Sequence, residues 1–483
     1  MKIIINLCFA VLLISGKSGY AQPQKAHDTV ADARRPNVLF IVVDDMNKYS
    51  VLKDYPVLKT PAIDKLIAQS YNFENASCAA PVCMPSRTAF FSGLYPHNTG
   101  VYINSNNKSP NPWEKTFLKD IEILPENFKR NGYTTWAMGK TFHIEIGKER
   151  EERMFDNRPV AKGGYGPFGE EKYWYGPNNW STIQPWEGPD SDFPDVRNVD
   201  AAIDFLEQKQ DKPFFMYLGL WRPHTPYTAP KRFFDMYQDE EMTLPPGYTE
   251  NDMDDIPFMG RNLVDSLNRF SKEGLTKKQI WLKLMKAYCA NTSFADWNIG
   301  RIMEALDKNG HAGNTIVVFS SDNGFHNGTK HRWEKATLWE QADAVPLLIR
   351  LPNGRAYKCP QTVSLIDIYP TLVEYCRLDP PEHKLDGVSL VPVLNNPHYK
   401  WDRPGFTTYG EQYASVRDER YRYIRYPDGS QELYDHQTDP YENNNVVHKP
   451  EMKPVISRLS GAIPKNFKKS IGGRYEVVRK QNL

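Results

Sequence analysis

The sequence predicts an α/β fold, in which a mostly parallel sheet is sandwiched by helices and is followed by a smaller antiparallel sheet. Four apolar runs typical of buried strands lie at wide intervals, at residues 37–43, 133–138, 213–220 and 315–320. Helical patterns separate these runs, and strands that alternate with helices favour parallel pairing. From about Gly405 the sequence becomes Tyr-rich and alternating, which favours antiparallel strands.

Individual elements follow from local signals. The run 37–43 (NVLFIVV) is continuously apolar and β-branched, as expected for a strand buried on both faces. Thr60 and Pro61 predict a helix through about residue 70, with Thr60 as its N-cap. A long helical pattern covers 276–308 and ends before Gly310. The alternating run 421–426, followed by a Pro-Asp-Gly turn, predicts a hairpin in the tail.

The chain divides into four predicted segments. Residues 1–21 are typical of a signal peptide, with Lys2, an apolar run over 3–14 and small residues before Gln22. Residues 22–34 form a linker, 35–396 a large catalytic domain, and 397–483 a C-terminal subdomain. Cys8 lacks the surroundings of a lipid-attachment site, and no later run is long and apolar enough to span a bilayer. We therefore expect a periplasmic or secreted protein without stable membrane insertion.

Charge and cysteine counts narrow the function. The chain has 60 Lys and Arg against 59 Asp and Glu, for a net charge of +1. This balance gives no reason to expect a nucleic-acid partner. Beyond Cys8, five cysteines remain, and an odd number in an exported protein leaves at least one thiol unpaired or chemically altered. These are Cys78, Cys83, Cys289, Cys359 and Cys376.

Polar side chains follow each of the four predicted strands. In order along the chain they are Asp44 and Asp45, then Lys140 and His143, then His224, and finally Asp322 and Asn323. Ligand sites of open parallel sheets collect at the carboxyl ends of the strands, so these residues are expected around one pocket. Taken singly, each group could equally consist of turn formers and helix caps.

The acidic members of this set favour a hard metal ion. Asp44, Asp45, Asp322 and Asn323 offer oxygen ligands only, which suit calcium or magnesium, whereas zinc sites more often contain His or Cys. Two adjacent carboxylates at a buried strand end would also repel each other strongly without a cation.

The run from Cys83 to Gly93 (CMPSRTAFFSG) carries the most specific signal. Cys83 could be a packed thiol, or a nucleophile whose pKa is lowered at a helix N-terminus. However, the pattern C-x-P-S-R, followed by Gly93, Pro96 and Gly100, is long and specific. It resembles the signature of the formylglycine-dependent sulfatases, in which this cysteine is oxidised to an aldehyde (3-oxoalanine).

The resemblance extends over about residues 35–447 and implies an alkaline-phosphatase-like fold. Within this family, the sequence resembles the iduronate-2-sulfatase branch in particular. The matching residues are Leu124-Pro125, Gly132-Tyr133, Gly139-Lys140, Phe142-His143, Pro223-His224, Pro226 and 230–234. Lys335, thirteen residues after Asp322, stands where the family places a basic residue that contacts sulfate. Asn323 departs from the iduronate enzyme, which has His there, so the exact substrate is not transferred.

The family implies a mechanism and a set of roles. One calcium ion would be held by Asp44, Asp45, Asp322, Asn323 and the modified Cys83, whose hydrated aldehyde attacks sulfur. Arg87, Lys140 and Lys335 would clamp the sulfate oxygens, His224 would protonate the leaving oxygen, and His143 would be the base that helps expel sulfate. The implied partners are a formylglycine-generating maturation enzyme and a sulfated oligo- or polysaccharide, such as a glycosaminoglycan with a uronate 2-sulfate, ulvan or carrageenan.

Two other functions remain open from the sequence. The first is a phosphate or phosphonate monoester hydrolase of the same superfamily, although the Cys-x-Pro-Ser-Arg run disfavours the serine- or threonine-dependent phosphatases. The second is a non-catalytic protein that binds sulfated glycans. Loss of Cys83 or Asp322 would have favoured that function, but both residues are present.

Overall fold

A computed structural model describes residues 35–48, 54–104, 111–157, 164–265 and 270–471. The predicted signal peptide and linker, residues 1–34, lie outside this part of the chain. In the described residues, no helix is long and apolar enough to cross a membrane.

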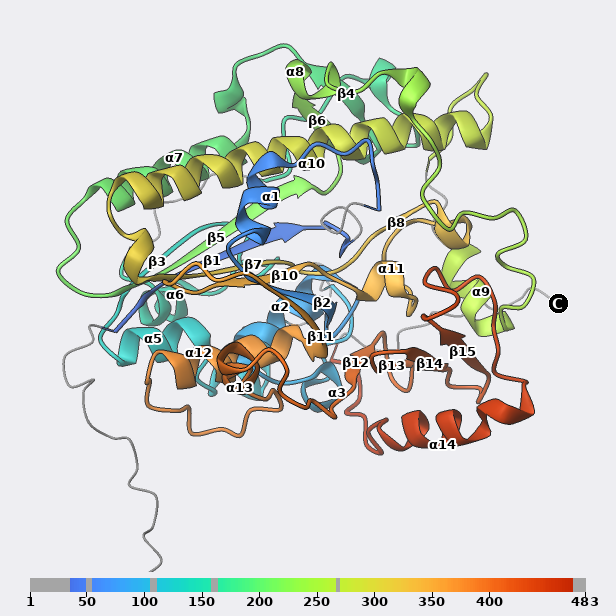
Figure 1. Cartoon of the computed structure of the whole chain (residues 1–483). Coiled ribbons are helices and arrows are strands. Elements are labelled where there is room, and N and C mark those ends of the chain that lie inside the picture. The colour runs from blue at the N-terminus through green and yellow to red at the C-terminus, as the bar shows by residue number, and fades with distance from the viewer. Residues whose placement is uncertain (1–34, 49–53, 105–110, 158–163, 266–269, 472–483) are drawn as a thin grey trace, which may run out of the picture. The chain divides into compact units, whose positions relative to one another are not determined.

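A seven-stranded sheet forms the centre of the structure (Figure 1). In spatial order its strands are β11 (Tyr357–Ser364), β2 (Tyr71–Ser77), β10 (Leu347–Arg350), β7 (Thr315–Ser321), β1 (Asn37–Asp44), β5 (Phe214–Pro223) and β3 (Thr134–Gly139). The four strands predicted from apolar runs are β1, β3, β5 and β7, and they lie side by side. They pair in parallel, as predicted.

The rest of the sheet was not predicted. β10 runs antiparallel to both of its neighbours, β7 and β2, whereas β11 is parallel to β2. These strands lack the long apolar runs of the other four: β10 has four residues, β2 is half polar, and β11 contains Pro360. The register of β11 shifts between Cys359 and Thr362, around that proline, which cannot donate a ladder hydrogen bond.

Strand β1 is buried on both faces, as its sequence predicts. Val38, Phe40 and Val42 pack in one hydrophobic cluster, whereas Leu39, Ile41 and Val43 pack in another on the opposite face. Helices α2 (Cys83–Ser92), α5 (Leu124–Arg130) and α12 (Ile368–Tyr375) cover the first face, and α1 (Pro61–Ile67), α7 (Pro194–Glu207) and α10 (Lys277–Lys308) cover the second (Figure 1). The sheet is therefore sandwiched between two helical layers.

The start of α1 differs from the prediction in one respect. Thr60 precedes the helix, but its side chain makes no capping hydrogen bond. The carboxylate of Asp296, on α10, accepts the backbone N–H groups of Ala62 and Ile63 at 3.1 and 2.7 Å instead. A long-range contact thus satisfies the free donors that a local cap would otherwise satisfy.

A four-stranded antiparallel sheet forms the C-terminal part of the described chain. Its order is β12 (Gly405–Thr408), β13 (Ala414–Arg417), β14 (Tyr421–Arg425) and β15 (Gln431–Asp435), and α14 (Lys453–Gly461) follows it. β14 and β15 are the predicted hairpin. The domain boundary at residue 396 stays a prediction.

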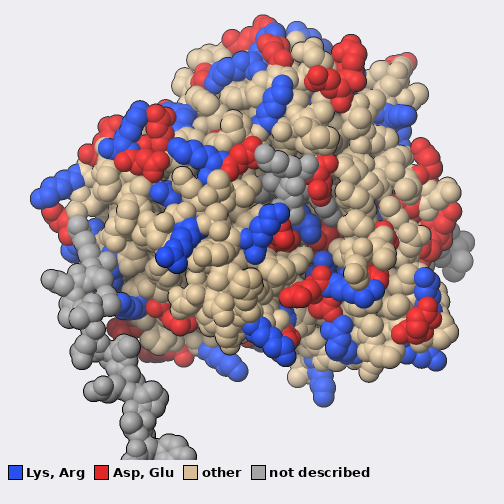
Figure 2. All heavy atoms as spheres, in the orientation of Figure 1, with Lys and Arg blue, Asp and Glu red and all other residues tan. Residues whose placement is uncertain are grey.

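The remaining elements are short. The helices are α3 (Pro96–Thr99), α4 (Pro112–Lys115), α6 (Lys148–Met154), α8 (Lys231–Phe234), α9 (Phe258–Asp265), α11 (Glu340–Asp343) and α13 (Val391–Asn395). The strands are β4 (Ile183–Trp186) paired with β6 (Tyr227–Pro230), and β8 (His326–Asn327) paired with β9 (Trp333–Glu334). On the face drawn in Figure 2, acidic and basic side chains are interspersed, in agreement with the balanced composition.

Candidate active site

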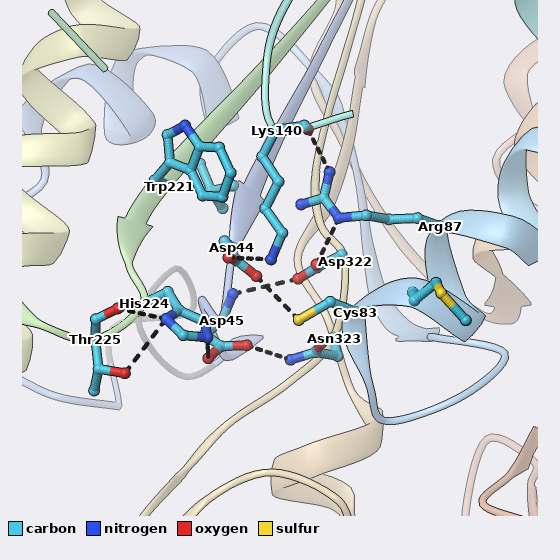
Figure 3. Close-up of polar contacts among 12 residues, drawn as sticks. Asp44, Asp45, Cys83, Arg87, Lys140, Trp221, His224, Thr225, Asp322 and Asn323 are labelled. Carbon is cyan, nitrogen blue, oxygen red and sulfur yellow. Dashed lines mark hydrogen bonds and ion pairs between the residues drawn. The ribbon is translucent and has the colours of Figure 1, made fainter. Parts of the chain in front are cut away.

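Polar residues from the ends of β1, β3, β5 and β7 meet at one edge of the large sheet (Figure 3). Asp44 is the last residue of β1, and Asp322 directly follows β7. The Asp45 N–H donates to the Asp322 side chain at 3.3 Å, and the Asp322 N–H donates to the Val43 carbonyl at 3.2 Å. The two strand ends are therefore joined by hydrogen bonds, which fixes both carboxylates at the same place.

Two glycines let Lys140 reach this place. Gly139, the last residue of β3, has φ +73°, and a Cβ there would lie 1.9 Å from the Gly219 carbonyl oxygen on β5. A Cβ at Gly219 would lie 1.9 Å from the Lys140 carbonyl oxygen. Only glycine at both positions allows such a close approach of the two backbones. The side chain of Lys140 then forms a fully buried ion pair with Asp44.

Cys83 is the first residue of α2, a helix in which every residue is buried. Its Sγ lies 3.3 Å from Asp44 Oδ1 and 2.8 Å from Lys335 Nζ. The adjacent Met84 N–H donates to the Asn104 side chain at 2.9 Å, which helps hold the start of the helix. The helix therefore directs the Cys83 side chain at the acidic strand ends.

Arg87, one turn after Cys83, lies beneath the site with its side chain wholly buried. Its Nε donates to Asp322 Oδ2 at 2.8 Å, and its Nη1 donates to the Lys140 carbonyl at 2.5 Å and to the Tyr217 hydroxyl at 2.9 Å. Its Nη2 is buried without a partner. Arg87 thus ties α2 to β3, β5 and β7, and Nη2 remains as a free donor.

Lys335 supplies a third cation from the segment after β9. Its ammonium group pairs with Asp45, and its side chain is 14% exposed, unlike that of Lys140. Arg332 supports it by donating from Nε to the Lys335 carbonyl at 2.8 Å. The backbone is unusual on either side, because Glu334 and Ala336 both have positive φ, at 95° and 70°.

These charges shift the pKa values of the two adjacent carboxyls in opposite directions. Burial alone would raise the pKa of Asp44, but Lys140 above all, followed by His224 and Lys335, holds it well below its usual range. Burial raises the pKa of Asp45 to about 7, and Lys335 only partly offsets this. An additional positive charge would therefore favour the ionised form of Asp45.

The donor set fits a hard divalent cation. Three carboxylates, from Asp44, Asp45 and Asp322, lie together with Asn323, whose Oδ1 is buried without a partner while its Nδ2 donates to Asp45 Oδ1 at 2.8 Å. An unpartnered buried oxygen beside repelling carboxylates suits a cation, and the donors are oxygens of the kind that calcium prefers. One ligand atom from each of Asp44, Asp45, Cys83 and His224 also lies within 4.8 Å of the others.

The surroundings of Cys83 disfavour a thiolate in the unmodified protein. Burial, and then the charge of Asp44, raise the pKa of the thiol, despite the opposing effect of Lys140 and Lys335. Reactive cysteines usually have a lowered pKa. The other cysteines of the described chain, Cys78, Cys289, Cys359 and Cys376, are also free and buried.

Two histidines lie near these charges. His224 follows β5, and its Nε2 lies 3.6 Å from Asp45 Oδ2. Its Nδ1 lies 2.6 Å from the Thr225 carbonyl oxygen, so Nδ1 carries the hydrogen and Nε2 faces Asp45. His143 has φ +70° and a buried Nδ1 without a partner. Burial lowers the pKa of both rings, and neighbouring lysines lower it further.

The structure brings all the predicted site residues together. These are Asp44, Asp45, Cys83, Arg87, Lys140, His143, His224, Asp322, Asn323 and Lys335. Sequence reasoning missed the aromatic residues beside them, among which are Tyr217, Trp221 and Tyr165. No local motif marks these positions: Tyr217 and Trp221 lie on β5, just before His224, whereas Tyr165 reaches the site from a separate segment.

Comparison with known proteins assigns a family. Residues 36–377 match the sulfatase family model, and 328–469 match a model described as N-sulphoglucosamine sulphohydrolase, C-terminal. A sulfatase from Formosa agariphila is 35% identical and covers 89% of this chain and 87% of its own. An ulvan-active sulfatase from the same organism is 27% identical, and the match covers 90% of this chain and 81% of that protein. Human iduronate 2-sulfatase is 30% identical, and the match covers 74% of this chain and 67% of that protein.

A solved structure shows the same fold. The phosphonate monoester hydrolase from Silicibacter pomeroyi superposes with a TM-score of 0.71 at 21% identity, covering 88% of this chain and 94% of its own. The alkaline-phosphatase-like fold predicted from the sequence is confirmed. On the match over 36–377 and the 35% identity over 452 residues, this chain belongs to the sulfatase family and is a sulfuric ester hydrolase.

Proposed function

We propose that this enzyme is exported and removes sulfate from a sugar of an extracellular sulfated polysaccharide, with a formylglycine made from Cys83 and one calcium ion. The observation that carries the proposal is the position of Cys83, whose Sγ lies 3.3 Å from Asp44 Oδ1 and 2.8 Å from Lys335 Nζ. The raised pKa of the thiol leaves the unmodified cysteine little thiolate, which supports a role for this residue after oxidation to formylglycine.

Two groups complete the site. Oxidised to formylglycine, Cys83 would supply a hydrated aldehyde as the oxygen nucleophile. Calcium held by Asp44, Asp45, Asp322 and Asn323 would supply positive charge, which lowers the pKa of a nearby hydroxyl and screens an anionic substrate.

Three cations, two of them fully buried, are suited to hold the sulfate group. Lys140 pairs with Asp44 and Lys335 with Asp45, and Arg87 keeps Nη2 free within the same cluster. Lysine supplies point charge, and the guanidinium supplies a directed donor. With calcium bound, the positive charge of the site would exceed its negative charge, which favours a sulfate monoester anion.

His224 is the proposed donor to the leaving oxygen. The hydrogen bond from Nδ1 to the Thr225 carbonyl fixes the ring, so that a protonated ring would direct Nε2–H toward the carboxylates of the site. Because burial lowers the pKa of His224, protonation would depend on the negative charge that the substrate brings. Proton transfer to the alcohol oxygen would accompany cleavage of the sulfur–oxygen bond. His143, whose Nδ1 is unpartnered, is the proposed base for the release of sulfate.

Sulfate release from defined glycans tests the proposal. Desalted ulvan, carrageenan and heparin oligosaccharides would be incubated with calcium-loaded enzyme, and the Cys83 peptide would be examined for the aldehyde by mass spectrometry. We expect release from one class, and loss of that release in Cys83→Ala. Cys289→Ala is the matched control, because Cys289 is also a buried free thiol but lies on α10. Equal activity of Cys83→Ala and the wild type would refute the nucleophile.

A phosphonate ester belongs in the same panel. The structural neighbour named as a phosphonate monoester hydrolase has the same fold at 21% identity, which carries no substrate to this chain. Hydrolysis of phosphonate esters alone, by protein with a confirmed aldehyde, would replace the sulfated sugar with this second substrate.

A further inference from the structure

Beside the charged site lies a cluster of aromatic rings that neither the metal site nor the sulfate contacts explain. Tyr165 lies 4.4 Å from Trp221 and 4.9 Å from Trp180, measured between ring centroids. All three side chains are half-buried, so part of each remains accessible. Phe168, which is 38% exposed, packs edge-on against Trp180 at 5.2 Å. We call Tyr165, Trp180 and Trp221 the aromatic wall.

The aromatic wall contacts two of the proposed functional residues. The His224 ring lies 4.4 Å from Tyr165 and 6.2 Å from Trp180 between centroids. Lys140 Nζ lies 5.2 Å from the centre of the Tyr165 ring and 5.7 Å from that of Trp221. In Figure 3, Trp221 and His224 lie on the β5 side of the site, across from Cys83 and Arg87 on α2.

Buried polar contacts hold the aromatic wall in place. Arg222, which is 1% exposed, donates from Nη2 to the Tyr165 carbonyl at 2.8 Å and from Nε to the Thr228 carbonyl at 2.9 Å. The Asp195 carboxylate accepts the N–H groups of Trp221 and Arg222 at 2.8 and 3.0 Å. Tyr165 and Trp221 are therefore fixed to the same strand by groups that leave part of each ring accessible.

We propose that the aromatic wall binds the pyranose ring that carries the scissile sulfate, and thereby selects cyclic sugar sulfates over acyclic alkyl sulfates. The inference rests on the proposed function, because it takes His224 as the donor to the leaving oxygen. The ring attached to that oxygen must then lie next to His224, where Tyr165 and Trp180 lie. The C–H face of a pyranose matches the electron-rich face of an aromatic ring, whereas a short flexible alcohol covers little of it.

A ratio of specificities tests this role. For each variant, kcat/KM would be measured for the oligosaccharide of the ulvan, carrageenan and heparin panel that the wild type hydrolyses best, and for ethyl sulfate. Trp180→Ala and Tyr165→Ala should each lower the ratio of glycan to ethyl sulfate up to about tenfold, mainly through KM. Trp180→Phe, which keeps a ring, should retain most of the ratio. Tyr399→Ala is the control, because Tyr399 is 45% exposed and lies outside the site.

Binding without turnover gives an independent readout. In the Cys83→Ala background, titration calorimetry with the same oligosaccharides should show weaker binding once Trp180 or Tyr165 is replaced by Ala. If the ratio and the affinity are unchanged in both alanine variants while the wild type hydrolyses the glycan, the proposed role of the aromatic wall is wrong. The proposed function is then unaffected. Wild-type hydrolysis of ethyl sulfate, without hydrolysis or binding of any glycan, would overturn both.

Discussion

Two charge clusters with the same numbers of carboxylates and cations have different surroundings in this protein. The active-site cluster combines Asp44, Asp45 and Asp322 with Arg87, Lys140 and Lys335. The C-terminal cluster combines Glu340, Asp343 and Glu442 with Lys48, Arg417 and Arg422. Each therefore has three carboxylates and three cations. Formal charge alone does not distinguish a catalytic cluster from a structural one.

The kind of cation and its access to solvent distinguish the two. In the C-terminal cluster the Arg422 fork pairs with all three carboxylates, contacting Asp343 at 2.6 Å and Glu442 at 2.8 Å, and its side chain is 1% exposed. In the active-site cluster, lysines contact Asp44 and Asp45, and Lys335 is partly exposed. A guanidinium fork fixes carboxylates in one geometry, whereas an ammonium group is a point charge that a ligand can replace.

The largest effect on stability is expected from a substitution that disrupts the C-terminal cluster. Arg422→Met would leave three carboxylates buried without their shared partner, and we expect it to lower the free energy of unfolding by about 3–5 kcal/mol. Denaturant unfolding, followed by fluorescence, measures this. Arg458→Met is the matched control, because Arg458 pairs with Asp418 at 2.6 Å but is 56% exposed, and its loss should cost at most about 1 kcal/mol. Equal stability of the two variants would refute the structural role of the cluster.

The next prediction is that replacing Lys335 in the active-site cluster lowers activity but hardly changes stability. Lys335→Met should lower kcat about 10²–10³-fold, since a preorganised positive charge next to the reacting group is lost. The free energy of unfolding of the calcium-loaded protein should change by less than about 1 kcal/mol, because the metal would still neutralise Asp45. Steady-state kinetics and denaturant unfolding of the same preparations measure both. A loss of stability as large as that of Arg422→Met would show that the two clusters do not differ in kind.

Calcium should bind at the active-site cluster and not at the C-terminal cluster, and its binding should stabilise the protein. At a concentration of about 100 Kd, calcium should raise the free energy of unfolding of the wild type by about 2.7 kcal/mol, and a chelator should remove this gain. Asn323→Ala, which removes a ligand oxygen, should reduce the gain.

His436→Ala is the control for the calcium experiment. Glu340, His436 and Glu442 also form a group that could hold a metal, but Arg422 already pairs with both carboxylates. A calcium gain that is lost in His436→Ala and kept in Asn323→Ala would place the ion in the C-terminal cluster.

Strand β1 shows where prediction from sequence succeeds, and the C-terminal cluster shows where it fails. The run 37–43, the acidic pair after it and the Cys83 motif each lie within one continuous segment, so local patterns reveal them. β10 and the aromatic wall depend on distant segments: β10 joins the sheet only through β7 and β2, and Tyr165 reaches the site through Arg222. Arg422 likewise meets carboxylates from two separate segments, Glu340 and Asp343 on α11 and Glu442 after β15, and no local spacing marks these contacts.

The smallest effect concerns pH and follows from the raised pKa of Asp45, which is about 7 because burial disfavours its charged form. Calcium binds the ionised carboxylate, so below pH 7 a proton must leave first, and the affinity should fall by up to about tenfold for each pH unit. Above pH 7 the affinity should be constant. Titration calorimetry between pH 5.5 and 8.5 measures this, and Asp45→Asn should remove the pH dependence along with much of the affinity.

The sign is opposite for Glu340 in the C-terminal cluster. Burial would raise the pKa of Glu340, but Lys48 and Arg422 hold it well below its usual range. A lowered pKa contributes stability above the unfolded-state value, about 4.3, and this is lost only as the pH falls below it. A raised pKa does the reverse, so the metal-free protein should lose stability as the pH rises through 7, when Asp45 becomes charged. Asp343, in the same cluster, has a pKa that burial raises to about 8, so the stability of the metal-free protein should respond to both clusters between pH 5.5 and 8.5. Calcium affinity should report on Asp45, and an affinity that stays constant down to pH 5.5 would give Asp45 an ordinary pKa.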